Sequence, residues 1–371
     1  MTRQRPEISL TAEQKRIVWR LRTEGPTPRI VLANDLGIYS GAMTRITREM
    51  IAIGVIEETS PDATPRGRPV VPLTISGRAG YAAGVTAHPG WIELTLVDFA
   101  GTVIARDVEP FDSPDPGPFA DAVERRLRGL AMTHGLMRSR FLGIGVAATG
   151  PMTVHDPNIR WAVPWLSGWR QVELESYFAD RLGMNVRVEN DASLAALAEY
   201  YHGELMRRCR TALVFFLGHG VGGGIILDRA LFRGAHGNAG EVGMLFPGDK
   251  PRPSGIDLLA NLQQAGAKIH SLLEVATVLE THHEVVEEWI ERAAVQLEDA
   301  VAAGVAWLDP DTIVLSGALP QQIMDRLGTR LGQGSWAQDH PITPKPVLRV
   351  TQLGSWAVAV GAALLPIHEI A

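Results

Sequence analysis

The residues best suited to hold a ligand gather in a glycine-rich stretch between positions 218 and 243. Its glycines permit positive φ angles and a close approach of the backbone to a ligand, as loops that hold phosphate groups require. A strand-like segment, not a helix, follows the first glycines, so the spacing is not that of a dinucleotide-binding fingerprint. Glu241 lies between the last glycines. It could be a surface charge at a turn, but the flanking glycines favour a carboxylate that backbone geometry holds in place.

A second polar group, Glu189-Asn190-Asp191, stands between a short strand-like segment and a helix predicted from 192 to 206. An Asn or Asp at the start of a helix often serves only as a cap. The same side chains could instead contact a ligand, and the residues alone leave both interpretations open.

The N-terminal region carries a different kind of chemistry, because its polar residues suit DNA. Thr11 to Gln14 has the pattern of a capping box, and two further helical segments from Arg29 are separated by a turn at 37–39. This pattern resembles the helix-turn-helix of DNA-binding regulators, with the second helix, 40–53, in the major groove. Its outward face offers base-contacting and phosphate-contacting groups: Ser40, Gly41, Thr44, Arg45 and Arg48.

A proline-rich stretch after residue 58 is typical of the wing of a winged helix. Arg66 and Arg68 at its base could enter an A·T-rich minor groove. Residues 1–80 carry 12 Lys and Arg against 8 Asp and Glu, a net charge of +4, whereas the rest of the chain carries −10. Each pattern has an alternative: the helix-turn-helix could be a chance helical pattern, and the arginine segment could be a solvated turn. Because the two patterns occur together and in this order on the one basic region, DNA binding is favoured.

Length and composition bound the remaining possibilities. A chain of 371 residues with 46% hydrophobic and 20% charged residues predicts two or three folded domains. The single cysteine, Cys209, excludes a disulfide framework and a cysteine-rich zinc site. The first residues lack the apolar core of a signal peptide, and no apolar stretch approaches the length of a bilayer span, so we expect a cytoplasmic protein with no membrane partner.

From residue 81 onward, segments typical of strands alternate with segments typical of helices. Three strands are expected within 81–110, followed by a helix at 116–134 and a buried strand at 141–147. Further segments predict a helix at 173–182, strands at 186–188 and 211–217, and a long amphipathic helix ending at Leu308. This alternation predicts an α/β body with mixed sheets.

Taken together, these residues resemble the ROK family (repressors, open reading frames, kinases). The resemblance covers nearly the whole chain and rests on a series of short motifs: Gly67-Arg68-Pro69, Gly143 to Val146, Gly150-Pro151, Glu189 to Ala192, the glycine run from Gly218, Gly237 to Gly243, Leu315 to Ala318, and Gly361 to Ala363. It implies an N-terminal winged helix-turn-helix and an actin/hexokinase-like body of two α/β lobes. The implied domains are 1–78 and 79–371, with lobes at about 79–190 plus the C-terminal helix and at 191–355.

The resemblance also implies roles for individual residues. In kinases of this family the aspartate matching Asp191 is the general base, and the residues matching Asn190 and Glu241 bind sugar hydroxyls. A carboxylate and an amide suit a sugar because its hydroxyls both donate and accept hydrogen bonds. With Gly150 these three residues form the predicted ligand site, whereas Trp161, Trp165 and Trp169 are expected in the core or at the rim, where one could stack on a sugar.

Two departures from the family pattern bear on function. Val85 to Gly90 stands where the family has an Asp-x-Gly-Gly-Thr loop that orients ATP phosphates, and Thr86 replaces the acidic residue, so kinase activity is not expected. Met244 stands where the family has a zinc-binding His that also contacts the sugar, and the family's three cysteines have no counterpart, so no metal or other cofactor is expected.

The sequence therefore predicts a transcriptional repressor that binds double-stranded operator DNA and responds to a sugar or sugar derivative. A homodimer or a tetramer is expected, because paired recognition helices contact half-sites about one helical turn apart. Two alternatives stay open: a sugar kinase with an added DNA-binding module, and a regulator that has lost ligand sensing.

Overall fold

The computed structural model describes residues 8–59, 71–154, 156, 158–203, 205–338 and 344–370. The chain divides into two compact units: Met1–Val146 with Glu173–Val188 and Ala362–Ala371, and Ala147–Val172 with Glu189–Gly361. Residues 147–172, which we assigned to the first lobe, therefore belong with the second unit. Among helices in the described ranges, none has the length and apolar character needed to cross a membrane.

The first unit begins with three helices and a small antiparallel sheet. The helices are α1 (Ala12–Glu24), α2 (Arg29–Leu36) and α3 (Ser40–Ala52), and the sheet has the order β1 (Thr27–Pro28), β3 (Pro72–Ile75), β2 (Ile56–Glu58). Thr11 caps α1 in the predicted capping box, in which its side chain accepts from the Gln14 amide and Gln14 accepts from the Thr11 amide. The three helices and the strands β2 and β3 follow the order predicted from the sequence, whereas β1 was not predicted.

A short turn connects α2 to α3 because Gly37 adopts a left-handed conformation, with φ of 65°. The apolar faces of these helices are buried as expected, with Leu32, Met43 and Met50 at most 1% exposed. The opposite face of α3 is solvent-exposed. Arg66 and Arg68 lie outside the described residues.

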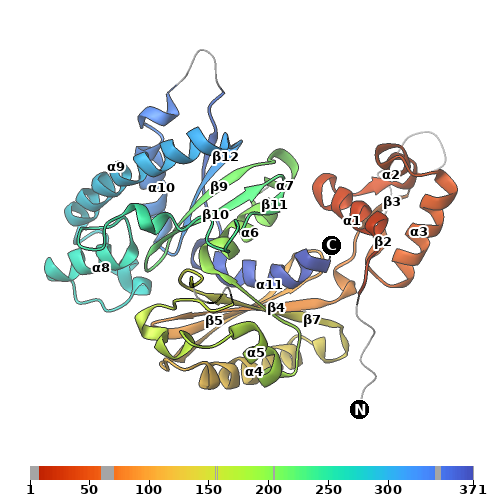
Figure 1. Cartoon of the computed structure of the whole chain (residues 1–371), viewed down its shortest axis with the longest axis horizontal. Coiled ribbons are helices and arrows are strands. Elements are labelled where there is room, and N and C mark those ends of the chain that lie inside the picture. The colour runs from red at the N-terminus through yellow and green to blue at the C-terminus, as the bar shows by residue number, and fades with distance from the viewer. Residues whose placement is uncertain are drawn as a thin grey trace. The chain divides into compact units, whose positions relative to one another are not determined.

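The rest of the first unit is built on a five-stranded sheet with the order β6-β5-β4-β7-β8. The strands are β4 (Tyr81–His88), β5 (Gly90–Asp98), β6 (Val103–Phe111), β7 (Phe141–Ala148) and β8 (Val186–Asn190). β4 pairs antiparallel with β5 and parallel with β7. The helices α4 (Pro116–Thr133) and α5 (Leu174–Leu182) lie together beneath this sheet (Figure 1).

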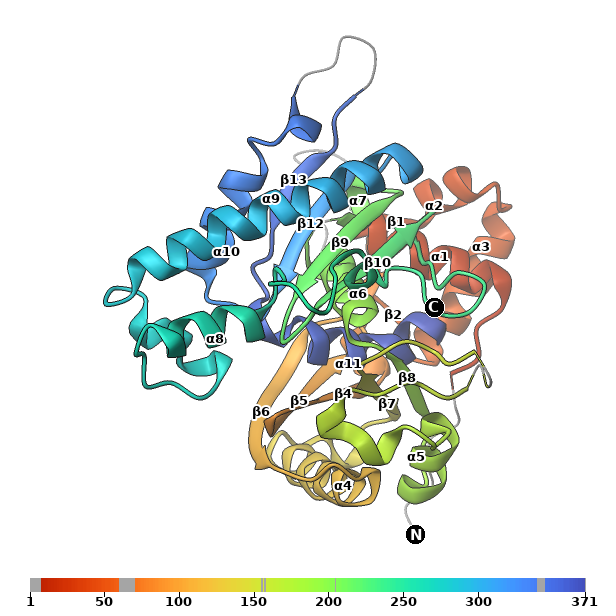
Figure 2. The same ribbon diagram turned by 60° about the vertical axis from the view of Figure 1, so that its left-hand side comes forward.

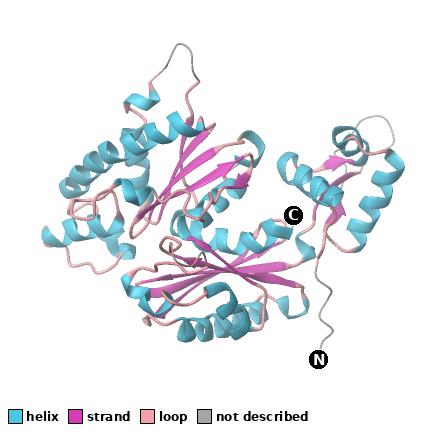
Figure 3. Ribbon diagram, viewed as in Figure 1, coloured by secondary structure: helices cyan, strands magenta, loops and turns pink. Residues whose placement is uncertain are grey.

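The second unit contains another five-stranded sheet, with the order β11-β10-β9-β12-β13, drawn in magenta in Figure 3. Its strands are β9 (Ala212–Leu217), β10 (Val221–Leu227), β11 (Ala230–Leu231), β12 (Thr312–Gly317) and β13 (Val347–Val350). Its helices are α6 (Asp191–His202), α7 (Leu205–Arg208), α8 (Gly255–Gln264), α9 (His283–Leu308), α10 (Gln321–Leu331) and the first half of α11 (Ala357–Ile370). The single helix predicted for 192–206 is thus broken near Gly203.

Side chains along β9 point alternately to the two faces of the sheet in the second unit, so a buried core lies on each face. Leu213 and Phe215, which pair in register with Ile313 and Leu315 of β12, pack into the core formed with α8, α9 and α10. Figure 2 shows α9 and α10 running side by side in this unit. The other face of the sheet is covered by α6, which contacts β9, β10 and β12.

The glycine run of β10 has a different role from the one expected. In the stretch 218–224 no glycine has a positive φ, and a Cβ on Gly224 would lie 2.5 Å from the Ala196 Cβ and 2.7 Å from the Ala192 carbonyl oxygen. Gly222 and Gly224 bring α6 close to the sheet, whereas a Cβ on Gly223 would lie 2.9 Å from the Gly240 carbonyl oxygen. Any effect of Gly222 and Gly224 on a ligand is therefore indirect. They set the position of the α6 N-terminus, where Asn190 and Asp191 lie.

Candidate functional site

Asn190 and Asp191 lie at the junction of β8 and α6. The side chain of Asn190 both caps α6 and reaches the other polar residues of the candidate site. Its Oδ1 accepts hydrogen bonds from the amides of Ala192 and Ser193, at 2.9 and 3.3 Å, and so caps α6. Its Nδ2 donates to Glu241 Oε1 at 3.4 Å. Capping therefore fixes the orientation in which the side-chain amide reaches Glu241.

Asp191 and Glu241 bring two carboxyl groups to the same place. Asp191 Oδ2 accepts a hydrogen bond from the Thr149 hydroxyl at 3.3 Å. The pKa of Glu241 is raised, first because the carboxyl group is partly buried and then because Asp191 is negatively charged, while Arg160 opposes the shift. A ligand that donates hydrogen bonds to these carboxylates would relieve part of that cost.

Arg160 and Glu189 form a buried ion pair beside this group. Arg160, 6% exposed, donates to the Gly150 carbonyl and to Glu189 Oε1, each at 3.1 Å. Glu189 also accepts from the Asn190 amide at 2.8 Å and from Arg233. Glu189 is thus occupied by partners within the protein and orients Asn190.

The loop that carries Gly150 is joined to the loop before Glu241. Asn238 accepts from the Met152 amide at 2.7 Å and donates to the Met152 carbonyl at 3.1 Å. Gly150 has a φ of 108°, and a Cβ there would lie 2.2 Å from the Trp161 carbonyl oxygen. Gly150 consequently permits the chain reversal that brings Arg160 to Glu189.

The structure thus brings Asn190, Asp191 and Glu241 together, and Gly150 is linked to Asn190 through Arg160 and Glu189. Arg160, Arg233 and Asn238 complete the arrangement, but the sequence analysis did not assign roles to them. Residues 152 and 238 are far apart in the chain, and no local pattern marks their pairing. Arg160 and Arg233 are likewise 29 and 44 residues from Glu189, so no local pattern marks these contacts.

The three tryptophans differ in their burial and contacts. Trp169 is fully buried, Trp161 is 59% exposed with Arg170 stacked over its ring, and Trp165 lies 6.3 Å from His219 between ring centroids. Met244 is 84% exposed. Within the described ranges, no cluster of three or more His, Cys, Asp or Glu side chains could hold a metal ion.

The face of α3 predicted to contact bases carries five residues, of which Ser40, Gly41, Arg45 and Arg48 are exposed and Thr44 is half-buried. The Thr44 hydroxyl donates to the Ser40 carbonyl at 2.9 Å. Arg45 forms an exposed ion pair with Glu49 at 2.9 Å. Tyr39, the N-cap residue of α3, is 91% exposed beside this face, and no sequence pattern singled it out.

The ROK family profile matches residues 120–369, which is more than half of the chain. The chain belongs to the ROK family. A solved ROK family transcriptional regulator, described as a homologue of the Escherichia coli MLC protein, superposes with a TM-score of 0.72 over 95% of both chains, at 22% identity. This likeness confirms the actin/hexokinase-like fold predicted for the body.

Sequence relatives extend the comparison. Protein y4fQ of Sinorhizobium fredii, described as uncharacterised, is 31% identical over 97% of this chain and 91% of its own length. The E. coli transcriptional dual regulator NagC is 27% identical over 61% of this chain and 55% of its own length. This ROK protein therefore matches only about half of the length of NagC.

Proposed function

We propose that this ROK protein is a transcriptional repressor that binds operator DNA through an N-terminal winged helix-turn-helix and responds to a sugar or sugar-derived ligand. The observation that carries the proposal is the combination, in one chain, of an exposed polar face on α3 with the Asn190, Asp191 and Glu241 cluster. NagC and the solved MLC homologue, both regulators by description, support it.

The DNA-binding part of the proposal rests on α1 to α3 and the sheet β1-β3-β2. The element order is that of a winged helix, with α3 following a tight turn as a recognition helix does. Arg45 and Arg48 project from the exposed face, where guanidinium groups can contact guanine or phosphate. Arg66 and Arg68 are proposed to contact the adjacent minor groove.

The ligand-binding part rests on complementary hydrogen-bonding groups. Asp191 and Glu241 offer acceptors, and the Asn190 amide offers a donor, which together match the hydroxyls of a sugar. Gly150 and the Arg160–Glu189 pair hold these groups in place. We propose that the site works without zinc or another cofactor, because an exposed methionine, Met244, stands at the position of the family's metal-binding His.

A regulatory role is favoured over a kinase role by the segment that replaces the family's phosphate loop. Val85 and Thr86 lie inside β4 as a regular strand, and Thr86 is only 4% exposed. The strand continues to His88, whose ring stacks on Trp91 at 4.8 Å between centroids. A strand residue turned away from solvent is poorly placed to orient ATP phosphates and a metal.

The proposed protein acts as a homodimer or a tetramer, because two recognition helices on one operator require at least two copies. A sugar would regulate DNA binding only if it bound the DNA-free and DNA-bound conformations with unequal affinity. The long helix α9 carries exposed Val295 and Trp307 and is the proposed dimer-packing element.

DNA binding is tested by incubating the full-length protein with fragments of genomic DNA and sequencing those retained. Arg45→Ala and Arg48→Ala are expected to lower retention of the enriched fragments, since each removes an exposed cation from α3. Arg128→Ala is a matched control, because Arg128 forms the same kind of i,i+4 ion pair, with Glu124, elsewhere in the first unit. Equal retention by all variants would contradict the proposal.

Ligand binding is tested by thermal-shift measurements against sugars, amino sugars and sugar phosphates. Stabilisation by one of them, lost in Asp191→Asn, supports the sugar site. Stabilisation by none of them would favour a regulator without ligand sensing. ATP-dependent phosphorylation of a sugar, abolished by Asp191→Asn, would instead establish the kinase alternative.

A further inference from the structure

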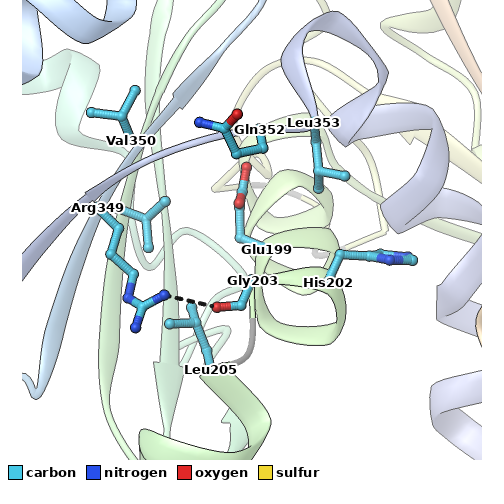
Figure 4. A pocket seen from close by; sticks show the side chains of 9 residues that line it. Glu199, His202, Gly203, Leu205, Arg349, Val350, Gln352 and Leu353 are labelled. Atoms are coloured by element: carbon cyan, nitrogen blue, oxygen red, sulfur yellow. Dashed lines mark hydrogen bonds between the residues drawn. The ribbon is translucent and has the colours of Figure 1, made fainter.

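A cavity separate from the Asn190 cluster lies between the C-terminal end of α6 and the edge strand β13. It encloses about 350 Å³, the size of a small-molecule site. Figure 4 shows the side chains around it, which come from α6, from the segment after α6, from β12, and from β13 and the residues that follow. Four of them are aliphatic: Leu205, Val314, Val350 and Leu353.

Arg349 supplies a cation to this cavity. One Nη donates to the Gly203 carbonyl at 3.3 Å, while the Nε is buried and has no hydrogen-bond partner among the described residues. Within the described ranges Arg349 forms no ion pair, unlike Arg160, Arg233 and Arg292 of the same unit. A buried guanidinium N–H without an acceptor is costly and is satisfied by an oxyanion.

Glu199 lies on the opposite wall and is 4% exposed. Its Oε1 accepts from the Ser316 hydroxyl at 2.7 Å and also from the Thr351 hydroxyl, whereas no described residue donates to Oε2. Burial raises the pKa of this carboxyl, and the two hydroxyl donors oppose the shift only in part. Together with the exposed amide of Gln352, Oε2 offers hydrogen bonds to a neutral polar group.

We propose that this cavity binds a small hydroxylated oxyanion, a carboxylate or a phosphate monoester, with the anionic group on Arg349 and a hydroxyl on Glu199. The aliphatic side chains contact the short carbon chain between these groups. The site is distinct from the proposed sugar site, because the two lie toward opposite ends of α6. A 12-residue helix spans about 18 Å.

Ligand-observed NMR with the full-length protein tests the proposal, using glycerate, glycerol 3-phosphate and glycerol as probes. Glycerate and glycerol 3-phosphate share a hydroxylated carbon chain and differ in the oxyanion, so they distinguish a carboxylate site from a phosphate site. Glycerol lacks the anion. Binding of at least one anionic probe with no binding of glycerol is the expected result, and binding of neither anion at 20 mM would overturn the proposal.

Variants then locate the binding. Arg349→Gln is expected to weaken anion binding by about tenfold or more, because it removes a charge-assisted hydrogen bond. Arg210→Gln is the control, since Arg210 pairs with Asp228 on the exposed surface of the same unit. Gln352→Glu adds a negative charge at an exposed position on the rim and is expected to weaken binding several-fold without disturbing the core.

Arg349→Gln and Gln352→Glu test the anion site independently of each other. If circular dichroism shows that Arg349→Gln does not fold, the Gln352→Glu measurement decides alone. Anion affinity unchanged in every folded cavity variant, or reduced equally in Arg210→Gln, would refute the site. Selective loss in the cavity variants establishes it, whether or not the sugar site binds any ligand.

Discussion

Replacing Asn190 separates its two structural roles, because each replacement retains a different one. Asn190→Ser keeps an oxygen that can cap α6 but loses the amide that reaches Glu241, and Asn190→Ala loses both. A lost cap costs about 1 kcal/mol, and a hydrogen bond as long as the one to Glu241 contributes about 0.5 kcal/mol. The free energy of unfolding should therefore fall by about 0.5 kcal/mol in the Ser variant and about 1.5 kcal/mol in the Ala variant.

Asn190→Asp keeps the cap and places a carboxylate opposite Glu241. At the 3.4 Å of the present contact, two unit charges repel by about 5 kcal/mol at an effective dielectric constant of about 20. Protonating one carboxyl avoids the repulsion, at about 1.4 kcal/mol for each pH unit above its pKa. Because the pKa of Glu241 is raised above the ordinary glutamate value of about 4.3, the loss is at most about 1 kcal/mol at pH 5 and at most about 5 kcal/mol at pH 8.

Urea unfolding followed by circular dichroism, at pH 5 and at pH 8, measures all three variants against the wild type. The expected order of stability at pH 8 is wild type, Ser, Ala, Asp, with the Asp variant recovering most of its stability at pH 5. Equal losses in the Ser and Ala variants, or a pH-independent loss in the Asp variant, would refute the dual role of Asn190.

Three further perturbations test other parts of the structure. Glu199→Gln should gain stability relative to the wild type as pH rises. In the wild type the raised pKa of Glu199 stabilises the folded state at low pH, and this stabilisation is lost as the pH rises through the pKa of the folded state, whereas the variant has no such carboxyl. Parallel stability curves of the two proteins from pH 4 to 8 would contradict this. Gly224→Ala should lose about 1–3 kcal/mol in urea unfolding through overpacking against Ala196, whereas Gly220→Ala, with open space around it, serves as the control and should change little. Tyr39→Ala should weaken operator binding in a fluorescence anisotropy titration without lowering the thermal midpoint, and unchanged affinity would remove Tyr39 from the DNA-binding face.

Local patterns were sufficient to predict the elements that carry the proposed functions. The capping box at Thr11, the turn at Gly37 and the helix after Asn190 all depend on neighbours within four residues, and the structure contains each of them. The family motifs added that Asn190 and Glu241, remote in the chain, lie near each other. Their hydrogen bond at 3.4 Å confirms that proximity.

The features that sequence reasoning missed depend on contacts between distant segments. Asn238 bonds to the backbone of Met152, and Arg160 pairs with Glu189 across a chain reversal at Gly150, so no periodic pattern reports either contact. The glycines of β10 were expected to approach a ligand, but Gly222 and Gly224 approach α6 and Gly223 approaches Gly240. A glycine in the sequence marks a position without a side chain, but only the fold determines which neighbouring segment packs into that space.

The most direct test of the proposed regulator is the affinity of the full-length protein for an enriched genomic fragment, measured by fluorescence anisotropy with and without the sugar that stabilises it. We expect the sugar to weaken DNA binding at least fivefold, and Asp191→Asn to bind the same DNA without responding to the sugar. No specific fragment, or a specific fragment whose affinity is the same with and without every sugar in the panel, would contradict a sugar-responsive repressor.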